Sequence, residues 1–312
     1  MSAHDVTRPL AGLKGTLRYV RAYRDHVFVV KIGGDVVSDP HGLDQIAAQL
    51  GLLHSLSIRI VVVHGGGPQA TAMSRRLGKE PEMVAGRRVT DDQALEVAKM
   101  VFAGTVNLDV LCALRRQGVQ AVGLSGVDAD LLTATRRPPV TVKDDAGLVR
   151  TVDYGHVGDI VAVDGRVLTT LLDQRFIPVV CSLAGDRDGQ VFNVNADTVA
   201  ERIAIALKAQ KLIFLTGVPG VLRDRNDPSS LVTFADPDDL AQLMESGALT
   251  GGMRPKVESC IRAATGGVER THIVDGRATD ALLQEVFTGA GAGTMIVGKK
   301  EKATYVGGEL AE

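Results

Sequence analysis

The chain contains no tryptophan, and aromatic residues make up only 4% of its 312 positions. Cysteine is scarce too: Cys112, Cys181 and Cys260 are an odd number, lie far apart and include no C-x-x-C pair. This usage excludes a disulfide framework and fits a reducing compartment.

Neither sign of charge predominates, because 35 basic residues are balanced by 37 acidic ones, for a formal net charge of −2. The chain therefore lacks the electrostatic footprint of a protein that binds nucleic acid or a membrane surface, whereas small charged metabolites remain possible ligands. No run of about 18 apolar residues occurs, and the first residues lack the apolar core of a signal peptide. We expect a cytoplasmic protein.

Several familiar ligand-binding motifs are missing as well. Neither Gly78-Lys79 nor Gly298-Lys299 has the flanking residues of a Walker A sequence, which excludes P-loop chemistry. The glycines of 289–294 lack the last glycine of a dinucleotide-binding loop and follow a predicted helix, so we interpret them as a turn. The histidines show neither metal-ligand spacing nor a Ser-His-Asp arrangement, so no zinc site, acyl-enzyme or protein metal ligand is assigned.

Apolar residues are plentiful, at 45%, and fall into alternating strand-like and helix-like segments. The length suggests two domains, and the alternation predicts a doubly wound α/β sheet. The stretch 136–165 breaks the alternation and is typical of hairpins, which we expect to lie over a site. The predicted strands are 27–32, 58–63, 119–124, 177–182 and 211–216, and the predicted helices are 41–56, 67–77, 91–116 and 196–208.

Three parts are predicted along the chain: a helical extension over 1–25, a first lobe over 26–208 and a second lobe over 209–312. In the extension, apolar residues recur at helical spacing between 10 and 23. No linker rich in Pro, Ser or Gly separates the lobes, which leaves open either one continuous sheet or a tight cleft.

Glycines directly follow two predicted strands, at Gly33-Gly34 and at Gly65-Gly66-Gly67. Ligands of parallel sheets bind at the carboxyl ends of the strands. Without a Cβ in the way, backbone N–H groups there can surround an anion, and Lys31 adds a positive charge. One such break alone favours a simple tight turn, but two in one βαβ stretch predict a phosphate site.

Three further segments sharpen this prediction: 86–91, 193–197 and 251–256. Together with the glycine breaks, and in this order, they make the chain from about residue 17 to 297 resemble the acetylglutamate kinases of the amino acid kinase family. The resemblance implies a three-layer αβα sandwich with a mainly parallel central sheet, in which the first lobe binds the amino-acid substrate and the second the nucleotide. It also implies transfer of the γ-phosphoryl group of ATP, with Mg²⁺, to the side-chain carboxylate of N-acetyl-L-glutamate, the second step of arginine biosynthesis.

This chemistry needs no general base, because a carboxylate acceptor is already ionised at neutral pH. By resemblance, Lys31 and Lys256 contact the transferring group from the two lobes, and Asp197 orients both lysines. His64 matches a family motif, but we expect it to shape the turn rather than to transfer a proton. The other implied site residues are the phosphate-binding Gly33 and Gly34 and the substrate-binding Gly66, Gly67, Arg88 and Asn193. Arg88 suits the α-carboxylate because a planar guanidinium can bind a carboxylate through two hydrogen bonds.

The chain departs from the family pattern at three positions. Family members usually have aspartate at the position of Gly217, an aliphatic residue at that of Arg254, and asparagine or a small residue at that of Asp35. Loss of a carboxylate at 217 predicts altered nucleotide binding rather than lost chemistry, because both lysines and Asp197 remain.

The segment 17–21 precedes Lys31 by the spacing seen in arginine-inhibited members of the family, whose amino-terminal helix joins dimers into a hexamer. The apolar residues of this helix, which predict burial against another subunit or against the same subunit's sheet, are Leu10, Leu13, Leu17 and Val20. The resemblance further implies an arginine site with Tyr19, His272 and Glu285. We therefore expect a homohexamer that L-arginine inhibits.

Two other functions stay open. A kinase for a carrier-linked aminoadipate or glutamate shares the scaffold, but such kinases tend to have a longer basic insert where 86–90 is uninterrupted here. A catalytically weak arginine sensor would keep the fold alone, and the retention of Lys31, Asp197 and Lys256 favours an enzyme over it.

Overall fold

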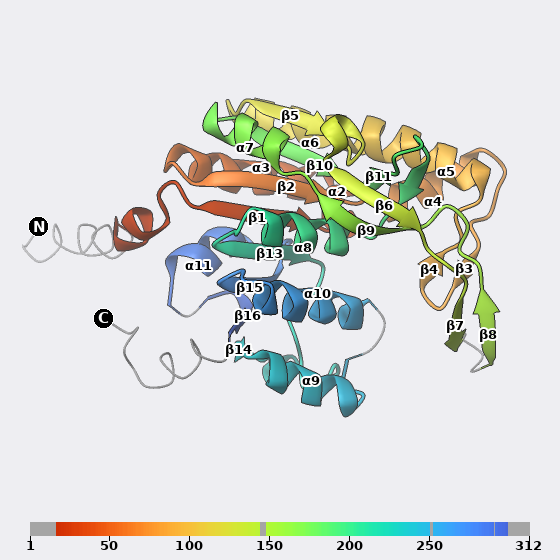
Figure 1. Cartoon of the computed structure of the whole chain (residues 1–312). Coiled ribbons are helices and arrows are strands. Elements are labelled where there is room, and N and C mark those ends of the chain that lie inside the picture. The colour runs from red at the N-terminus through yellow and green to blue at the C-terminus, as the bar shows by residue number, and fades with distance from the viewer. Residues whose placement is uncertain (1–16, 144–147, 250–251, 290, 299–312) are drawn as a thin grey trace, which may run out of the picture.

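The structure, a computed structural model, describes residues 17–143, 148–249, 252–289 and 291–298. Among these residues, an eight-stranded sheet occupies the centre in the order β14-β16-β15-β13-β1-β2-β10-β5 (Figure 1). Its strands are β1 (Val27–Ile32), β2 (Arg59–His64), β5 (Ala121–Leu124), β10 (Ile177–Cys181), β13 (Lys211–Thr216), β14 (Phe234–Ala235), β15 (Arg270–Asp275) and β16 (Gly293–Val297). Neighbouring strands are parallel except for β15 and β16, so the predicted α/β fold with a mainly parallel sheet is confirmed.

The central strands are apolar because both of their faces are covered. In β1 and β2 every residue after the first is buried, as expected for parallel strands packed between helices. β1 pairs with β2 on one side and with β13 on the other. The sheet therefore continues from the first predicted lobe into the second, and of the two arrangements left open, the continuous sheet is the one observed.

Helices pack on both faces of the sheet and complete three layers (Figure 1). One face is covered by α2 (Gly34–Val37), α3 (Pro40–Ser55), α4 (Gly67–Arg76), the segment that begins with α5 (Asp92–Ala98), and α11 (Ala281–Phe287). The other face is covered by α7 (Arg166–Asp173), α8 (Ala196–Ala206), α9 (Pro237–Glu245) and α10 (Met253–Thr265).

The predicted helix 91–116 is one helical run with an irregular middle. α5 passes into the π-helical η1 (Lys99–Val106) and then into α6 (Asn107–Arg116). Such π-helical segments are often found at functional sites. Among the described residues, this is the one helix with the length and composition of a membrane span, but half of its apolar window is buried inside the protein.

The stretch 136–165 forms hairpins, as predicted. Its strands belong to the antiparallel pairs β6 (Leu132–Arg136) with β9 (Gly158–Val163), and β7 (Val140–Lys143) with β8 (Val149–Val152). The β6–β9 pair joins β11 (Leu183–Gly185) and β12 (Val191–Asn193) in a four-stranded side sheet. A further pair, β3 (Met83–Val84) with β4 (Arg87–Arg88), lies beside the β7–β8 hairpin at one end of the molecule (Figure 1).

The predicted helix 10–23 is described only in part: residues 17–23 are helical, and 10–16, with Leu10 and Leu13, lie outside the described residues. Tyr23 is buried and meets Phe28 edge to face, with ring centroids 5.4 Å apart. The end of this helix is therefore anchored on its own chain, whereas Leu17 is 41% exposed.

Candidate functional site

The carboxyl ends of β1, β2 and β10 lie at one edge of the sheet, where α4 and α8 begin. Helix N-termini present unpaired N–H groups and the positive ends of helix dipoles, both of which favour anions. A cavity of about 350 Å³ opens at this edge. The predicted site residues that line it are Lys31, Gly34, Gly66, Gly67, Arg88, Asn193 and Asp197.

Asp197 lies between the two lysines that the sequence analysis singles out. Its Oδ1 is 2.8 Å from Nζ of Lys31, and its Oδ2 accepts a hydrogen bond from Nζ of Lys256 over 2.9 Å. All three side chains are only 11% exposed. Because Lys31 is on β1, Asp197 in the first turn of α8 and Lys256 in the first turn of α10, the cluster joins the two predicted lobes.

Two ammonium groups and one carboxylate leave this cluster with a net positive charge. Burial by itself raises the pKa of Asp197, but the charges of Lys31 and Lys256 outweigh it and hold that pKa well below its usual range. Burial lowers the pKa of Lys31, Asp197 opposes this change, and Lys256 adds to it. The ammonium of Lys256 also lies 5.1 Å from the ring centroid of Phe214. A preorganised positive group beside the cavity can stabilise the charge on a phosphoryl group.

The two glycines after β1 differ in position. The N–H of Gly33 donates to the carbonyl of Leu215 over 2.8 Å, and a Cβ there would lie 2.9 Å from the same oxygen. Since this N–H is already paired and Gly33 is not among the cavity residues, its role in this structure is to let β1 approach β13 closely. Gly34 lines the cavity, where a Cβ would lie 2.8 Å from Cδ of Pro68.

Gly66 and Gly67, which follow β2, differ in their surroundings: Gly66 is closely packed, whereas Gly67 is open. A Cβ on Gly66 would lie 2.6 Å from Cδ1 of Phe102, a residue of the π-helical segment. Gly67 begins α4, and a Cβ there would meet nothing within 4 Å. The backbone at Gly67 is thus open to a ligand.

Arg88 and Asn193 line the cavity from different elements, β4 and β12. Nη2 of Arg88 donates to Oγ1 of Thr71 over 2.6 Å and to the carbonyl of Gly67 over 3.2 Å. Nδ2 of Asn193 donates to Oγ1 of Thr90 over 3.1 Å. Arg88 and Asn193 thus place a cation and an amide at the wall of the same cavity.

His64 is buried beneath the glycine turn. Its Nδ1 donates to the carbonyl of Gly65 over 2.7 Å, which requires the proton on Nδ1, and Nε2 then accepts from Nδ2 of Asn107 over 3.0 Å. Burial lowers the pKa of His64 to about 4, so the ring is neutral at physiological pH. Both nitrogens bond within the fold, in agreement with the expected structural role.

Sequence reasoning missed several residues of the cavity. Ser182 is buried and follows directly after β10 at the same sheet edge as Lys31, a position that the strand prediction could have flagged. Asn195 caps α8, because its side chain accepts from the N–H groups of Asp197 and Thr198. The cavity residues without a local sequence signal are Thr71, Met83 and Phe102.

The three departures from the family pattern occupy different places. A Cβ on Gly217 would lie 3.6 Å from both Oδ2 of Asp35 and Cζ of Arg277, so a carboxylate from α2 stands next to the glycine. Asp35 lines the cavity. Arg254 pairs with Glu258 on the same helix, over 3.2 Å, and does not line the cavity.

A second cavity, of about 150 Å³, lies between the helical segment 17–23 and the sheet edge near β14 and β16. Tyr19 and Glu285 line it, whereas His272 is buried behind Glu285. Nδ1 of His272 lies 2.5 Å from Oε1 of Glu285, and Nε2 lies 3.1 Å from Nζ of Lys211. Burial by itself raises the pKa of Glu285, but the bond from His272, the N–H of Ala292 and the charge of Lys211 together outweigh it and lower that pKa to about 2. Glu285 is therefore an ionised carboxylate at a cavity wall.

Comparison with known proteins identifies a family. The Amino acid kinase family matches residues 26–275. The acetylglutamate kinase of Myxococcus xanthus is 49% identical over 291 residues, covering 93% of this chain and 94% of its own. That of Methanothrix thermoacetophila is 42% identical over 280 residues, covering 90% and 95%.

Solved structures agree in fold. N-acetylglutamate synthase from Neisseria gonorrhoeae, complexed with coenzyme A and N-acetyl-glutamate, superposes with a TM-score of 0.78 at 30% identity over 92% of this chain. This chain spans only 63% of that synthase. Carbamate kinase from Giardia lamblia, at 16% identity over 88% of this chain and 99% of its own, has a TM-score of 0.61 and shares the fold alone. The chain therefore belongs to the amino acid kinase family and, within it, is an ATP-using acetylglutamate kinase of arginine biosynthesis.

Proposed function

We propose that Lys31, Asp197 and Lys256 form the phosphoryl-transfer centre of this kinase. The lysines neutralise charge on the oxygens of the transferring group, and Asp197 holds both ammonium groups in place. The observation that supports this assignment is the buried contact of one carboxylate with both lysines, over 2.8 and 2.9 Å. Since the acceptor carboxylate is already ionised, the residues need only align the two substrates and stabilise charge.

The amino-acid substrate is assigned to the cavity of about 350 Å³. Arg88 binds its α-carboxylate, Asn193 hydrogen-bonds to it, and the backbone of Gly66 and Gly67 contacts the acceptor end. Gly34 contacts the phosphoryl group. Gly33 supports this loop through its bond to Leu215.

A coupled assay of ADP release tests the substrate assignment. N-acetyl-L-glutamate is expected to support turnover, and N-acetyl-L-aspartate and free L-glutamate are expected to react far more slowly, because one lacks the chain length and the other the acyl group. Equal turnover of free glutamate would contradict the assigned cavity. Activity only with a carrier-linked amino acid would favour the alternative kinase.

The proposal extends to Mg²⁺, to the lobes and to the compartment. Within the described residues no group of three or more His, Cys, Asp or Glu side chains could hold a metal ion. Mg²⁺ commonly keeps water ligands and binds nucleotide phosphates, so it would enter bound to ATP.

The two lobes keep the bounds expected from the sequence. The substrate lobe is assigned to residues 26–208 and the nucleotide lobe to residues 209–312. The protein is assigned to the cytoplasm.

We also propose that L-arginine inhibits the enzyme by binding in the second cavity. The ionised carboxylate of Glu285 suits a guanidinium, Tyr19 lines the same cavity, and His272 orients Glu285. The synthase from Neisseria gonorrhoeae has also been solved with coenzyme A and L-arginine, at 29% identity and with 65% of its chain spanned. The likeness to this arginine-bound synthase supports the proposal by analogy.

We propose that the protein forms a hexamer through contacts of the helix 17–23. Its apolar residue Leu17 is 41% exposed, and Val20 is only partly buried, so neither is fully covered by the described part of its own chain. Burial against the same residues of another copy would remove this apolar surface from water. Because Tyr19 is on the same helix, assembly and arginine binding would be linked.

A further inference from the structure

His156 connects the two chain segments that carry the proposed substrate residues. Its backbone N–H donates to the carbonyl of Thr90 over 2.7 Å, and its carbonyl accepts from the N–H of Asn193 over 2.9 Å. Thr90 is fully buried and stands two residues after Arg88. The segment around His156 therefore lies between the Arg88 and Asn193 segments and helps to set their separation.

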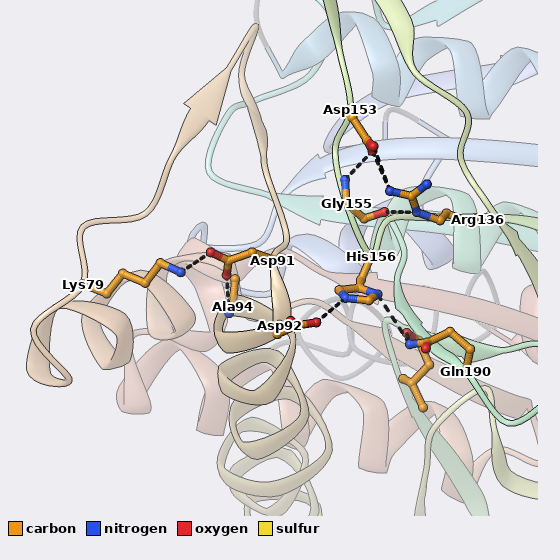
Figure 2. A network of polar contacts seen from close by, with 10 residues as sticks. Lys79, Asp91, Asp92, Ala94, Arg136, Asp153, Gly155, His156 and Gln190 are labelled. Carbon is orange, nitrogen blue, oxygen red and sulfur yellow. Dashed lines mark hydrogen bonds and ion pairs between the residues drawn. The ribbon is translucent and has the colours of Figure 1, made fainter.

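The side chain of His156 extends this connection to a third element (Figure 2). Its Nε2 lies 2.7 Å from Oδ1 of Asp92, the first residue of α5, and its Nδ1 lies 3.5 Å from Nε2 of Gln190. The imidazole is 26% exposed, whereas the carboxylate of Asp92 is 98% exposed. Apart from its bond to the ring, the Asp92 side chain thus projects into solvent.

Neighbouring contacts hold the α5 side of this junction (Figure 2). Asp91 caps α5 by accepting from the N–H of Ala94 over 2.9 Å, and it is paired with Lys79. Because the cap fixes the start of the helix, it holds Asp92 in position independently of the contact with His156.

The other side of the junction is held as closely (Figure 2). Asp153 accepts from the N–H of Gly155 over 2.9 Å and pairs with Arg136 over 2.8 Å. Gly155 has a φ of +69°, and a Cβ there would lie 2.4 Å from the carbonyl of Thr90. A glycine is therefore needed for this segment to reach Thr90.

We infer that His156 is a positioning residue for the amino-acid substrate, acting through its contact with Asp92. The contact holds the start of α5 against the His156 segment and so maintains the spacing between Arg88 and Asn193. The hydrogen bond from Nδ2 of Asn193 to Oγ1 of Thr90, 3.1 Å long, carries this spacing to the cavity. The inference rests on the proposed roles of Arg88 and Asn193.

Steady-state kinetics of His156→Ala, Asp92→Ala and the double variant test the inference. Each single variant is expected to raise the KM for N-acetyl-L-glutamate about fivefold, the size of effect that a partly exposed hydrogen bond to a carboxylate can supply. The double variant should raise it no further, because either change breaks the same contact. The kcat and the KM for ATP should stay near their original values. His156→Gln should restore most of the loss, because its amide N–H can donate to Asp92.

Two comparisons make the outcome decisive. Asp173→Ala, which removes an ion pair of 3.0 Å with Arg59 at the amino end of β2, should leave the KM unchanged, because the cavity lies at the carboxyl end of this strand. Arg88→Ala should raise the KM if the proposed substrate site is right; if it does not, the site itself is wrong rather than the positioning role.

The inference is overturned if Arg88→Ala raises the KM while Asp92→Ala leaves it unchanged, or if the variants lower kcat and spare the KM. Since the Asp92 side chain is 98% exposed, its replacement decides the question even if His156→Ala fails to fold.

Discussion

At the scale of single residues, the site depends on one buried carboxylate that two ammonium groups share. Buried charges are tolerated when they are paired, and removal of one partner leaves the other charge unbalanced. Asp197 contacts both Lys31 and Lys256, and the cluster keeps one positive charge in excess. That excess is available to an anionic substrate.

Replacement of Lys31 or Lys256 by alanine should lower kcat much more than it affects folding. Loss of one preorganised donor costs about 3 to 4 kcal/mol of transition-state stabilisation, or roughly a hundredfold to a thousandfold in kcat. The coupled ADP-release assay measures the change, and thermal unfolding of the same variants checks the fold. Turnover at the original rate in either variant would remove that lysine from the phosphoryl-transfer centre.

Arg88→Ala should act mainly on the KM for N-acetyl-L-glutamate. Its contact with the non-reacting α-carboxylate is made equally in the ground and transition states, so its loss weakens binding without slowing the chemical step. Arg87→Ala is the matched control, because Arg87 is an adjacent, exposed arginine that does not line the cavity. A KM that does not change in Arg88→Ala would place the α-carboxylate elsewhere.

At the scale of elements, the helical segment 17–23 has two kinds of contact. Tyr23 packs in the core of its own chain and lies under the ammonium of Lys211, 4.9 Å from the ring centroid, whereas Leu17 is exposed. One end of the helix thus belongs to the protomer, and the other presents apolar surface. The proposed roles need both kinds of contact: one end of the helix must border the second cavity, and the other must be free to contact another protomer.

Deletion of residues 1–24 should convert hexamers into dimers and abolish inhibition by arginine. The deletion removes both the proposed contact between dimers and Tyr19 of the second cavity. Analytical ultracentrifugation and activity in millimolar arginine measure the two effects. A full-length protein that sediments as a dimer, or that is indifferent to arginine, would contradict the regulatory proposal and leave the kinase itself unaffected.

Glu285→Gln separates arginine binding from assembly. The variant should remain a hexamer and lose sensitivity to arginine, because it removes the carboxylate that faces the cavity and leaves the helix 17–23 in place. The coupling between arginine and catalysis is typically worth about 1 to 3 kcal/mol, so the inhibition should weaken by roughly fivefold or more. Unaltered inhibition would exclude Glu285 as the guanidinium partner.

At the scale of the whole molecule, stability depends on a histidine that stays neutral in the folded state. Burial lowers the pKa of His64 from 6.5 to about 4. Between these values the unfolded chain binds a proton that the folded chain does not, so the free energy of unfolding should fall as pH decreases from about 6.5 to about 4. The free energy of unfolding should therefore be higher above pH 6.5 than below pH 4 by an amount on the order of 3 kcal/mol.

Urea unfolding at several pH values measures this effect in the full chain and in His64→Gln. The variant has no titrating ring at this position, so its stability should depend less on pH over this interval, whatever its stability at neutral pH. Parallel curves for the two proteins would show that His64 does not titrate as its burial implies.

Much of the architecture could be predicted from local patterns. Runs of β-branched residues identify strands such as Val27–Ile32 and Lys211–Thr216, because such residues pack well in a sheet that is covered on both faces. Element ends were less certain: the strand expected over 119–124 begins at Ala121. The π-helical turn in the predicted helix 91–116 has no local signature at all.

The sequence by itself determined the alternation of the main strands and helices up to residue 216, the glycine turns after β1 and β2, and the residue types of the site, because each depends on neighbours along the chain. Only the tertiary structure decided which side chains meet. The contact of Asp197 with Lys31 and Lys256, the pairing of Gly33 with Leu215, and the burial of His272 behind Glu285 join residues distant in sequence. Such contacts follow from the pairing of β1 with β13 and from the packing of helices on the sheet, which no local pattern encodes.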